Sequence, residues 1–313
     1  MIFVTGATGL VGSALVHYLL AKGQRVVVGL RTIIAQDWPK GVESRIIGNL
    51  GQAAMDDLDL YGMSVVVHCA ARAHVMHDTE ADPLSAYRRE NVKGTLELAQ
   101  RAAECGVRRF VYISSIKVHG ESTSVGQVFC ADDPPCPQDP YGVSKMEAEQ
   151  GLRAVARQTG MEVVIVRPPL VYGPGVKANF ASLMRVVKRG LPLPLGAVHN
   201  QRSLIGLDNL IDFLITCIDH PLAANQTFVV SDGQDVSVPD LVRGLADAMG
   251  VKAYLLPIPV PALQFGAALL GKRDAVNRLC ENLQVDTDKV RKLLAWSPPI
   301  SLYEGLRRVV RGV

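Results

Sequence analysis

The chain has 313 residues, which is more than one small core needs and fits a large α/β unit with a smaller partner domain. Hydrophobic residues make up 48% and charged residues 20%, so the composition excludes a disordered or collagen-like chain. The net charge is +3 without a long run of lysine or arginine, so we expect no nucleic-acid partner. The six cysteines are scattered without a C-x-x-C pair, which is typical of reduced thiols in a cytoplasmic protein.

Apolar strands and helical segments alternate from the N-terminus. Strands are expected at residues 2–5 and 25–30, and a helix at 10–21 between them, which together form a βαβ unit. Further patterns predict strands at residues 65–69, 110–114, 163–167 and 228–230, and helices at 92–105 and 141–158. Apolar strands joined by crossover helices indicate a Rossmann-like, doubly wound parallel sheet of the α/β class.

The local composition changes after Arg167, where proline and glycine become frequent. This change predicts a second, smaller and discontinuous domain that binds the substrate. We place the dinucleotide-binding domain at residues 1–173 plus 202–235, and the substrate domain at residues 174–201 plus 236–313.

Two features argue against a membrane or secretory segment. Strand-like residues begin at Ile2, which leaves no room for a secretory signal ahead of the fold. The uncharged stretch 253–271 is long, but it contains three prolines near its start, and these prevent a continuous spanning helix. We therefore expect no transmembrane segment, although this stretch could line an apolar pocket or touch a membrane surface.

A glycine loop of sequence GATGLVG lies between the first strand and the first helix. Small residues let the turn tighten and let the backbone approach a pyrophosphate, which N–H groups at the helix N-terminus then bind. Glycines also occur in plain turns, but the strand–loop–helix context favours dinucleotide binding. The cofactor-binding residues predicted here are Gly6, Gly9, Leu10, Val11 and Gly12.

The second strand ends in Gly29-Leu30-Arg31-Thr32, without the carboxylate that NAD sites normally place there to bind the ribose hydroxyls. Arg31 could instead pair with a 2′-phosphate. The sequence therefore favours NADP and leaves NAD possible, with an exposed arginine at a strand end as the plain alternative.

A tyrosine and a lysine stand four residues apart, Tyr141 and Lys145, on a helix that Asp139 and Pro140 are expected to start. An ammonium beside the phenol favours the phenolate, so the tyrosine can act as an acid or a base. The spacing alone also arises by chance on a solvated helix face.

Two serines, Ser114 and Ser115, follow the strand expected at 110–114. Ligands of open α/β sheets bind at the carboxyl ends of the strands, so a hydroxyl there can hydrogen-bond a reacting oxygen. The glycine loop, the serines and the Tyr141–Lys145 pair are thus predicted to share one crevice.

These motifs occur together with several others along nearly the whole chain. They are Ala70-Ala71, Asn91-Val92-Lys93-Gly94-Thr95, Val118-His119-Gly120 after Ser115, Arg167-Pro168, and Arg202-Ser203 ahead of Asp208. With them the chain resembles the extended short-chain dehydrogenases/reductases, in the branch of nucleotide-sugar epimerases, dehydratases and reductases. The resemblance implies that Ser115, Tyr141 and Lys145 are catalytic, and it implies cofactor contacts at Asn49, Ala70, Ala71, Lys145 and Pro168. It also implies a homodimer formed through the helices at 92–105 and 141–158.

The chain departs from this family at four positions. Members that eliminate water carry an Asp-Glu pair after the catalytic Ser or Thr, where this chain has Ile116 and Lys117, so 4,6-dehydration is not expected. Asn49 stands where many relatives have an adenine-binding aspartate, and His119 replaces a tyrosine, which we interpret as a packing change.

Several functions remain open within this resemblance. The leading expectation is a reductase that uses NADPH to reduce the C4 ketone of a UDP-4-keto-6-deoxy-sugar, giving a UDP-N-acetylquinovosamine-type product for surface polysaccharide. The alternative is a UDP-hexose 4-epimerase that retains NAD. A reductase or dehydrogenase of lipophilic alcohols and a non-catalytic NADP-binding sensor are further possibilities.

Substrate contacts are expected at Ser115, Lys117, Asn179 and Arg202. Arg202 could bind the diphosphate through its guanidinium fork or form a surface ion pair with Asp208. Lys117 could touch only solvent, and Asn179 could simply cap a helix. His68 and the run His74-Val75-Met76-His77-Asp78 do not have the spacing of a metal site, so no metal is expected.

Overall fold

The computed structural model describes residues 1–32, 38, 42–52, 55–73, 82–176, 178–269, 271 and 273–312. Its centre is a seven-stranded sheet in the order β3-β2-β1-β4-β5-β6-β9, in which every neighbouring pair is parallel. The strands are β1 (Ile2–Thr5), β2 (Val26–Leu30), β3 (Val42–Ile46), β4 (Val65–His68), β5 (Arg109–Ile113), β6 (Glu162–Arg167) and β9 (Thr227–Val229). The α/β fold with a Rossmann-like doubly wound sheet is therefore confirmed.

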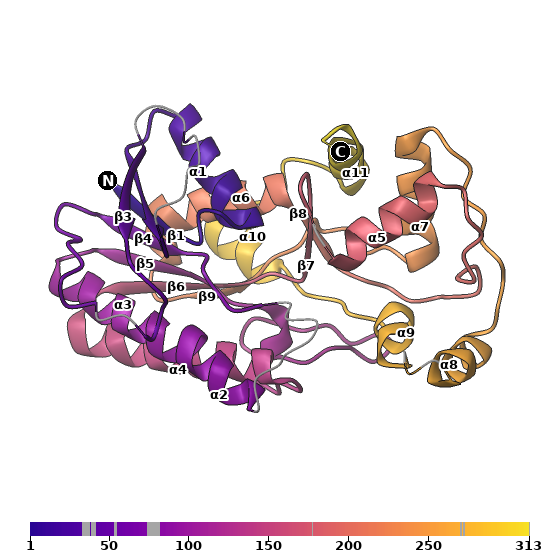
Figure 1. Ribbon diagram of the computed structural model, residues 1–313, viewed down its shortest axis with the longest axis horizontal. Helices are drawn as coiled ribbons and strands as arrows, with labels where there is room; N and C mark the ends of the chain where they lie inside the picture. Colours follow the sequence, from indigo (N-terminus) through magenta and orange to yellow (C-terminus); the bar gives the residue numbers. More distant parts are fainter. Residues whose placement is uncertain are drawn as a thin grey trace.

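Helices cover both faces of this sheet (Figure 1). One face carries α1 (Leu10–Ala21), α6 (Leu207–Asp219) and α10 (Asp288–Leu294). The other carries α3 (Gly94–Glu104) and α4 (Pro140–Thr159), with α2 (Pro83–Tyr87) and the π-helix η1 (Arg88–Lys93) beside them. Neighbouring residues of a strand point to opposite faces of the sheet. Val4 packs in the apolar cluster with α1, α6 and α10, and Phe3 packs in the cluster with α3 and α4.

Local sequence explains where α4, the helix that contains Tyr141 and Lys145, starts and ends. Asp139 is its N-cap and accepts a hydrogen bond from the Gly142 N–H at 2.6 Å, while Pro140 takes the first helical position. The helix ends at Gly160, whose φ of 76° is a left-handed conformation that glycine adopts readily. These signals fix the axial position of every side chain on α4.

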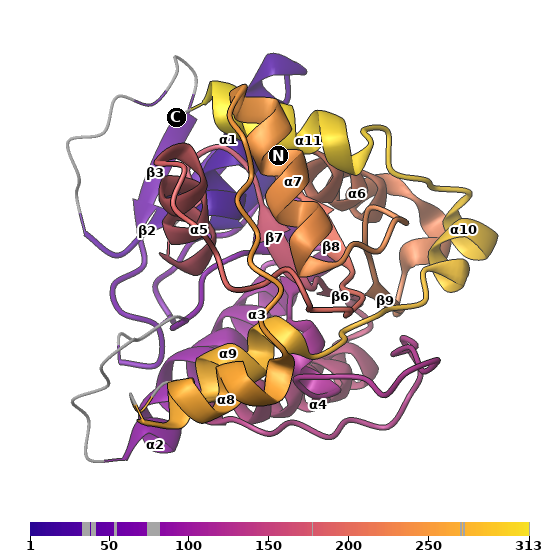
Figure 2. The same ribbon diagram turned by 90° about the vertical axis from the view of Figure 1, so that its right-hand side faces the viewer.

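The remaining elements form a smaller body beyond the carboxyl ends of the strands. A two-stranded parallel sheet pairs β7 (Leu170–Tyr172) with β8 (Leu204–Gly206). Around it pack α5 (Ala178–Lys188), α7 (Val238–Met249) and α11 (Leu302–Arg311). Two further helices, α8 (Val260–Leu269) and α9 (Arg273–Cys280), lie against each other, as Figure 2 shows. The short 3₁₀ turns are η2 (Ile116–Val118) and η3 (Pro221–Ala223).

The boundary predicted between two domains stays a prediction. Residues 236–313 were assigned to the substrate domain, yet Val290, Leu294 and Trp296 join the apolar cluster beneath β1 and β4. The long connection after η2 is also tied to the C-terminal part, because Phe129 N donates to Gln284 O at 2.9 Å. Within the described residues, no helix is both long enough and apolar enough to cross a bilayer.

Candidate active site

The glycine loop forms a tight turn ahead of α1. Gly6 has a φ of 66°, and the Gly9 N–H donates to the Gly6 carbonyl at 2.9 Å. A Cβ added to Gly12 would lie 2.3 Å from that carbonyl oxygen, so only glycine fits there. Gly9 caps α1 without a side-chain hydrogen bond, which leaves backbone N–H groups at the helix start for an anion. The tight turn and the free N–H groups agree with the predicted pyrophosphate site, and its role in cofactor binding stays a prediction.

The loop after β4 lies directly behind this turn. A Cβ added to Gly6 would come 2.6 Å from the backbone nitrogen of Ala70, so the segment of Ala70 and Ala71 packs on the glycine loop. Arg31 follows the end of β2 and is exposed, and Asn49 is also exposed. Both side chains are placed at the strand ends where the sequence analysis expects the adenosine part of the cofactor, and their contacts with it stay predictions.

The residues expected to be catalytic come together at the end of β5. The ammonium of Lys145 donates to the Ile113 carbonyl at 2.8 Å and lies 5.8 Å from the centre of the Tyr141 ring. The Ser115 side chain lies near the Tyr141 phenol and acts to lower its pKa. The Pro168 carbonyl accepts from the Ile116 N–H at 3.0 Å, which joins the end of β6 to the same region.

Burial shifts both ionisable groups of the pair toward their neutral forms. It raises the pKa of Tyr141, with the charges of Asp139 and Tyr87 acting in the same direction and the Ser115 side chain opposing them. Burial lowers the pKa of Lys145 to about 7, and Glu149 opposes this shift. A lysine with a pKa near neutrality can accept or release a proton at physiological pH.

Asn91 is a residue for which the sequence analysis assigned no role. From the π-helix η1 its side chain donates to the Arg72 carbonyl at 3.1 Å and to the Ser144 hydroxyl at 3.0 Å, and it accepts from the Arg72 N–H at 2.8 Å. It thus fixes the loop after β4 to α4. A buried asparagine with both ends of its amide satisfied is a positioning element, and the only sequence signal was its place in the Asn-Val-Lys-Gly-Thr motif.

Lys117 does not point freely into solvent. Its ammonium pairs with Asp139 at 2.5 Å and with Glu121 at 2.8 Å, which ties η2 to the cap of α4. The alternative that it meets only solvent is therefore wrong, and a substrate contact would have to share the ammonium with these carboxylates. The side chain of Asn179, which belongs to α5, is outside the described residues.

Arg202 does not pair with Asp208. Its guanidinium donates to the carbonyls of Arg278 at 2.7 Å and Glu281 at 3.0 Å, at the C-terminal end of α9. Asp208 instead forms an ion pair of 2.8 Å with Arg308 of α11. The ion-pair alternative is thus wrong, while the proposed diphosphate contact of Arg202 stays a prediction.

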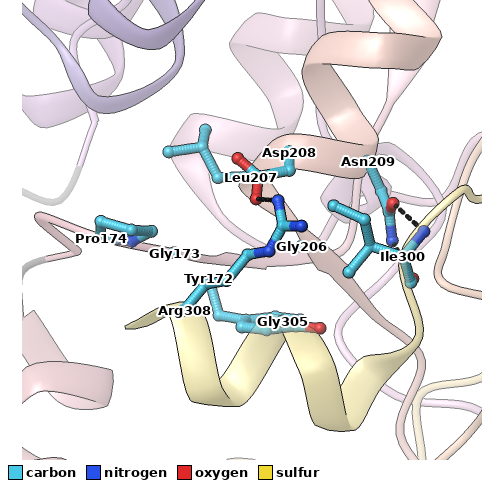
Figure 3. A pocket seen from close by; sticks show the side chains of 10 residues that line it. All are labelled: Tyr172, Gly173, Pro174, Gly206, Leu207, Asp208, Asn209, Ile300, Gly305 and Arg308. Carbon is cyan, nitrogen blue, oxygen red and sulfur yellow. Dashed lines mark hydrogen bonds and ion pairs between the residues drawn. The ribbon is translucent and has the colours of Figure 1, made fainter. Parts of the chain in front are cut away.

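Figure 3 shows the surroundings of that Asp208–Arg308 pair. The pair borders a cavity of about 10 Å³, which has room for about one water molecule. Its ten lining residues include Tyr172, Asn209 and Ile300 and none of the predicted catalytic side chains. A larger hollow of about 450 Å³ lies beside α4 and reaches Glu149, Arg153 and Arg167.

Two histidines, His68 and His119, have structural partners. His68 is fully buried between the hydroxyls of Thr5, 2.6 Å from Nδ1, and Thr95, 3.0 Å from Nε2. Residues 74–78 lie outside the described residues, so their part of the metal prediction is untested. His119 stacks on Phe129 with ring centres 5.4 Å apart, and its Nε2 accepts from Arg167 at 2.7 Å. Its role is therefore polar as well as packing.

Comparison with known proteins gives a consistent result. The profile of the NAD dependent epimerase/dehydratase family matches residues 2–231. A Vibrio cholerae protein named UDP-glucose 4-epimerase is 48% identical over 99% of this chain and 94% of its own length. An Escherichia coli O157:H7 4-epimerase of N-acetylglucosaminyl-diphospho-undecaprenol is 25% identical over 99% of the chain and 94% of its own length.

Solved structures agree on the fold. The Thermotoga maritima UDP-glucose 4-epimerase with UDP-glucose matches with a TM-score of 0.77 and 23% identity, covering 99% of this chain and 97% of that one. The Bacillus cereus UDP-glucuronic acid 4-epimerase with NAD matches with a TM-score of 0.79 and 21% identity, covering 99% and 95%.

Proposed function

Because this chain belongs to the NAD dependent epimerase/dehydratase family, we propose that it is a 4-epimerase of a UDP-hexose. The observation that carries this proposal is the 48% identity, over nearly the full length of both chains, to the Vibrio cholerae protein named UDP-glucose 4-epimerase. The sequence alone favours a 4-keto reductase, and the comparisons support the alternative, a UDP-hexose 4-epimerase, better. The site has the parts that either reaction needs, since both remove or add hydrogen at one carbon.

The chain's own residues would act on the C4 oxygen of the sugar. Tyr141 takes the proton from the C4 hydroxyl and returns it after the sugar has exposed its other face. Ser115, whose side chain acts on the same phenol, orients the same oxygen. Lys145, held by the Ile113 carbonyl, places a positive charge beside the phenol and favours the phenolate.

A nicotinamide cofactor would supply the hydride acceptor and donor, and the glycine loop fits its pyrophosphate. An epimerase must end with the cofactor in its starting form, so the cofactor stays bound throughout the reaction. We assign NAD, as in the Bacillus cereus structure, instead of the NADP that Arg31 suggested. Arg31 and the missing carboxylate at the end of β2 remain the observations that favour NADPH and a reductase.

The deciding experiment combines cofactor content and product analysis. Purified protein would be denatured and its released nucleotide identified, and intact protein would be incubated with UDP-glucose without added cofactor. We expect stoichiometric NAD and formation of UDP-galactose, with Tyr141→Phe as a control that retains NAD but is inactive. NADP content, or turnover of UDP-4-keto-6-deoxy-N-acetylglucosamine only with added NADPH, would overturn the proposal in favour of the reductase.

A further inference from the structure

A buried carboxylate, Glu149, lies one helical turn beyond Lys145 on α4. It is 1% exposed, and its oxygens accept from the Ser114 hydroxyl at 2.6 Å and from Arg167 at 2.9 and 2.5 Å. Arg153 approaches the same carboxylate at 3.3 Å. Burying a charge is unfavourable unless it is paired and hydrogen-bonded, and here both carboxylate oxygens are satisfied.

The cation of this pair connects further segments. Arg167 ends β6 and is 3% exposed. Its remaining terminal nitrogen donates to His119 Nε2 at 2.7 Å and to the Ala131 carbonyl at 3.0 Å. One carboxylate–guanidinium pair therefore joins α4 to the end of β6, the segment after η2 and the long connection that follows it.

The same helix face contacts three consecutive residues at the end of β5. Tyr141, Lys145 and Glu149 are spaced by four and lie above one another on α4. They contact Ser115, the Ile113 carbonyl and Ser114 in turn. Glu149 makes the third of these contacts, and its carboxylate is also paired with the guanidinium of Arg167.

We propose that Glu149 is a positioning residue of the active site, which holds Ser115 against Tyr141 and Lys145 through its bonds to Ser114 and Arg167. This inference rests on the proposed function only in that these three residues perform the chemistry, and a reductase would use them in the same way. A hydroxyl that orients a reacting oxygen must be placed within a fraction of an ångström. The bond from Ser114 to Glu149 therefore affects the position of Ser115, the next residue in the chain.

Glu149 also sets the electrostatic surroundings of Lys145. The groups that face this ammonium are Cys69 and His68 from β4 and its loop, Tyr112 from β5 at 4.5 Å, and Tyr141 and Glu149 from α4. Burial raises the pKa of Cys69 to about 12 and lowers that of His68 to about 3, so both are neutral near pH 7. Glu149 is therefore the negative charge that keeps the Lys145 pKa from falling further.

The test uses Glu149→Gln, which keeps the shape of the side chain and removes its charge. We expect kcat to fall about tenfold or more with KM nearly unchanged, because the substrate still binds but the hydroxyl is misplaced. The titration of the Lys145 ¹³Cε signal, followed by NMR in lysine-labelled protein and assigned with Lys145→Arg, should move to lower pH. Ser114→Ala, which leaves the Glu149–Arg167 pair intact, should lower kcat several-fold without moving this titration.

Glu162→Gln is the matched control, since Glu162 begins β6 and pairs with Arg108 at 2.9 Å and the buried Arg109 at 2.7 Å. It should cost stability and leave both kcat and the Lys145 titration unchanged. An unchanged Lys145 titration in Glu149→Gln, an undiminished kcat in Ser114→Ala, or the same losses in Glu162→Gln would overturn the inference. Failure of the proposed function would look different: the wild type would not convert UDP-glucose, while the NMR difference would persist.

Discussion

Replacement of Gly12 by alanine tests the glycine loop most directly. The added Cβ would lie 2.3 Å from the Gly6 oxygen and 2.7 Å from the Gly6 carbonyl carbon, whereas ordinary contacts begin near 3.4 Å. The loop or the start of α1 must therefore move by about 1 Å. Overpacking of this kind costs about 1–3 kcal/mol, and the better helix propensity of alanine offsets about 1 kcal/mol of it. We expect a net loss of about 0–2 kcal/mol in the free energy of unfolding, measured by urea denaturation of the cofactor-free protein.

The same displacement should weaken cofactor binding. Hydrogen bonds to a charged group contribute about 1.5–3 kcal/mol each, so losing one N–H contact lowers affinity by about 10- to 100-fold in calorimetry. Gly266→Ala is the control, because it makes the same change inside α8 with no atom within 4 Å of the new Cβ. It should stabilise the protein by about 0.5–1 kcal/mol and leave cofactor affinity unchanged. Equal behaviour of the two variants would refute the steric reasoning.

Four further variants test the site. Tyr141→Phe should retain the cofactor and lose about 10²- to 10⁴-fold in kcat, and near-normal turnover would exclude it as the acid and base. Arg31→Ala tests the cofactor assignment: with NAD as the cofactor we expect NAD affinity to be unchanged, whereas a loss of about 1.5–3 kcal/mol confined to NADPH would support a 2′-phosphate contact and the reductase. Arg202→Ala should raise KM and leave kcat unchanged if the guanidinium binds a diphosphate. A lower Tm with unchanged KM would instead mean that Arg202 has only the structural role of bonding to α9. Burial lowers the Lys145 pKa from 10.5 to about 7, so the folded chain binds fewer protons than the unfolded chain between these values and its stability rises with pH there. Lys145→Met should therefore be more stable than wild type at pH 7, by an amount that shrinks toward pH 10 in thermal unfolding of the cofactor-free protein.

The strands and helices that flank the glycine loop could be predicted almost to the residue. β1 and α1 have the expected bounds, because a buried parallel strand is a continuous apolar run and the loop marks the helix start. β3 was not predicted, since its sequence VESRI is half-exposed and charged. It forms because the edge of β2 offers a parallel partner over five residues, which the local pattern of β3 does not reveal.

The chemistry of the site was readable where it depends on short spacing or on the end of a strand. Tyr141 and Lys145 are one turn apart, and Ser115 follows β5. Asn91 and Glu149 could not be assigned from the sequence, because their partners Ser144 and Ser114 are 53 and 35 residues away. A glutamate on a helix is usually solvated, so only the packing of α4 on β5 identifies this one as buried.

The pKa shifts of Tyr141 and Lys145 explain why these two side chains need a further charge nearby to be in their ionised forms. Burial favours the neutral phenol of Tyr141 and the neutral amine of Lys145, so neither is held in its charged form by the desolvated protein alone. A positive charge brought next to the phenol favours its ionisation, and by linkage an ionised phenol favours whatever brings that charge. Glu149 acts on the other half of the pair, since its carboxylate favours the ammonium of Lys145. Cofactor binding at the glycine loop therefore favours the phenolate of Tyr141, and the buried carboxylate of Glu149 favours the ammonium of Lys145, so both stabilise the same charged pair.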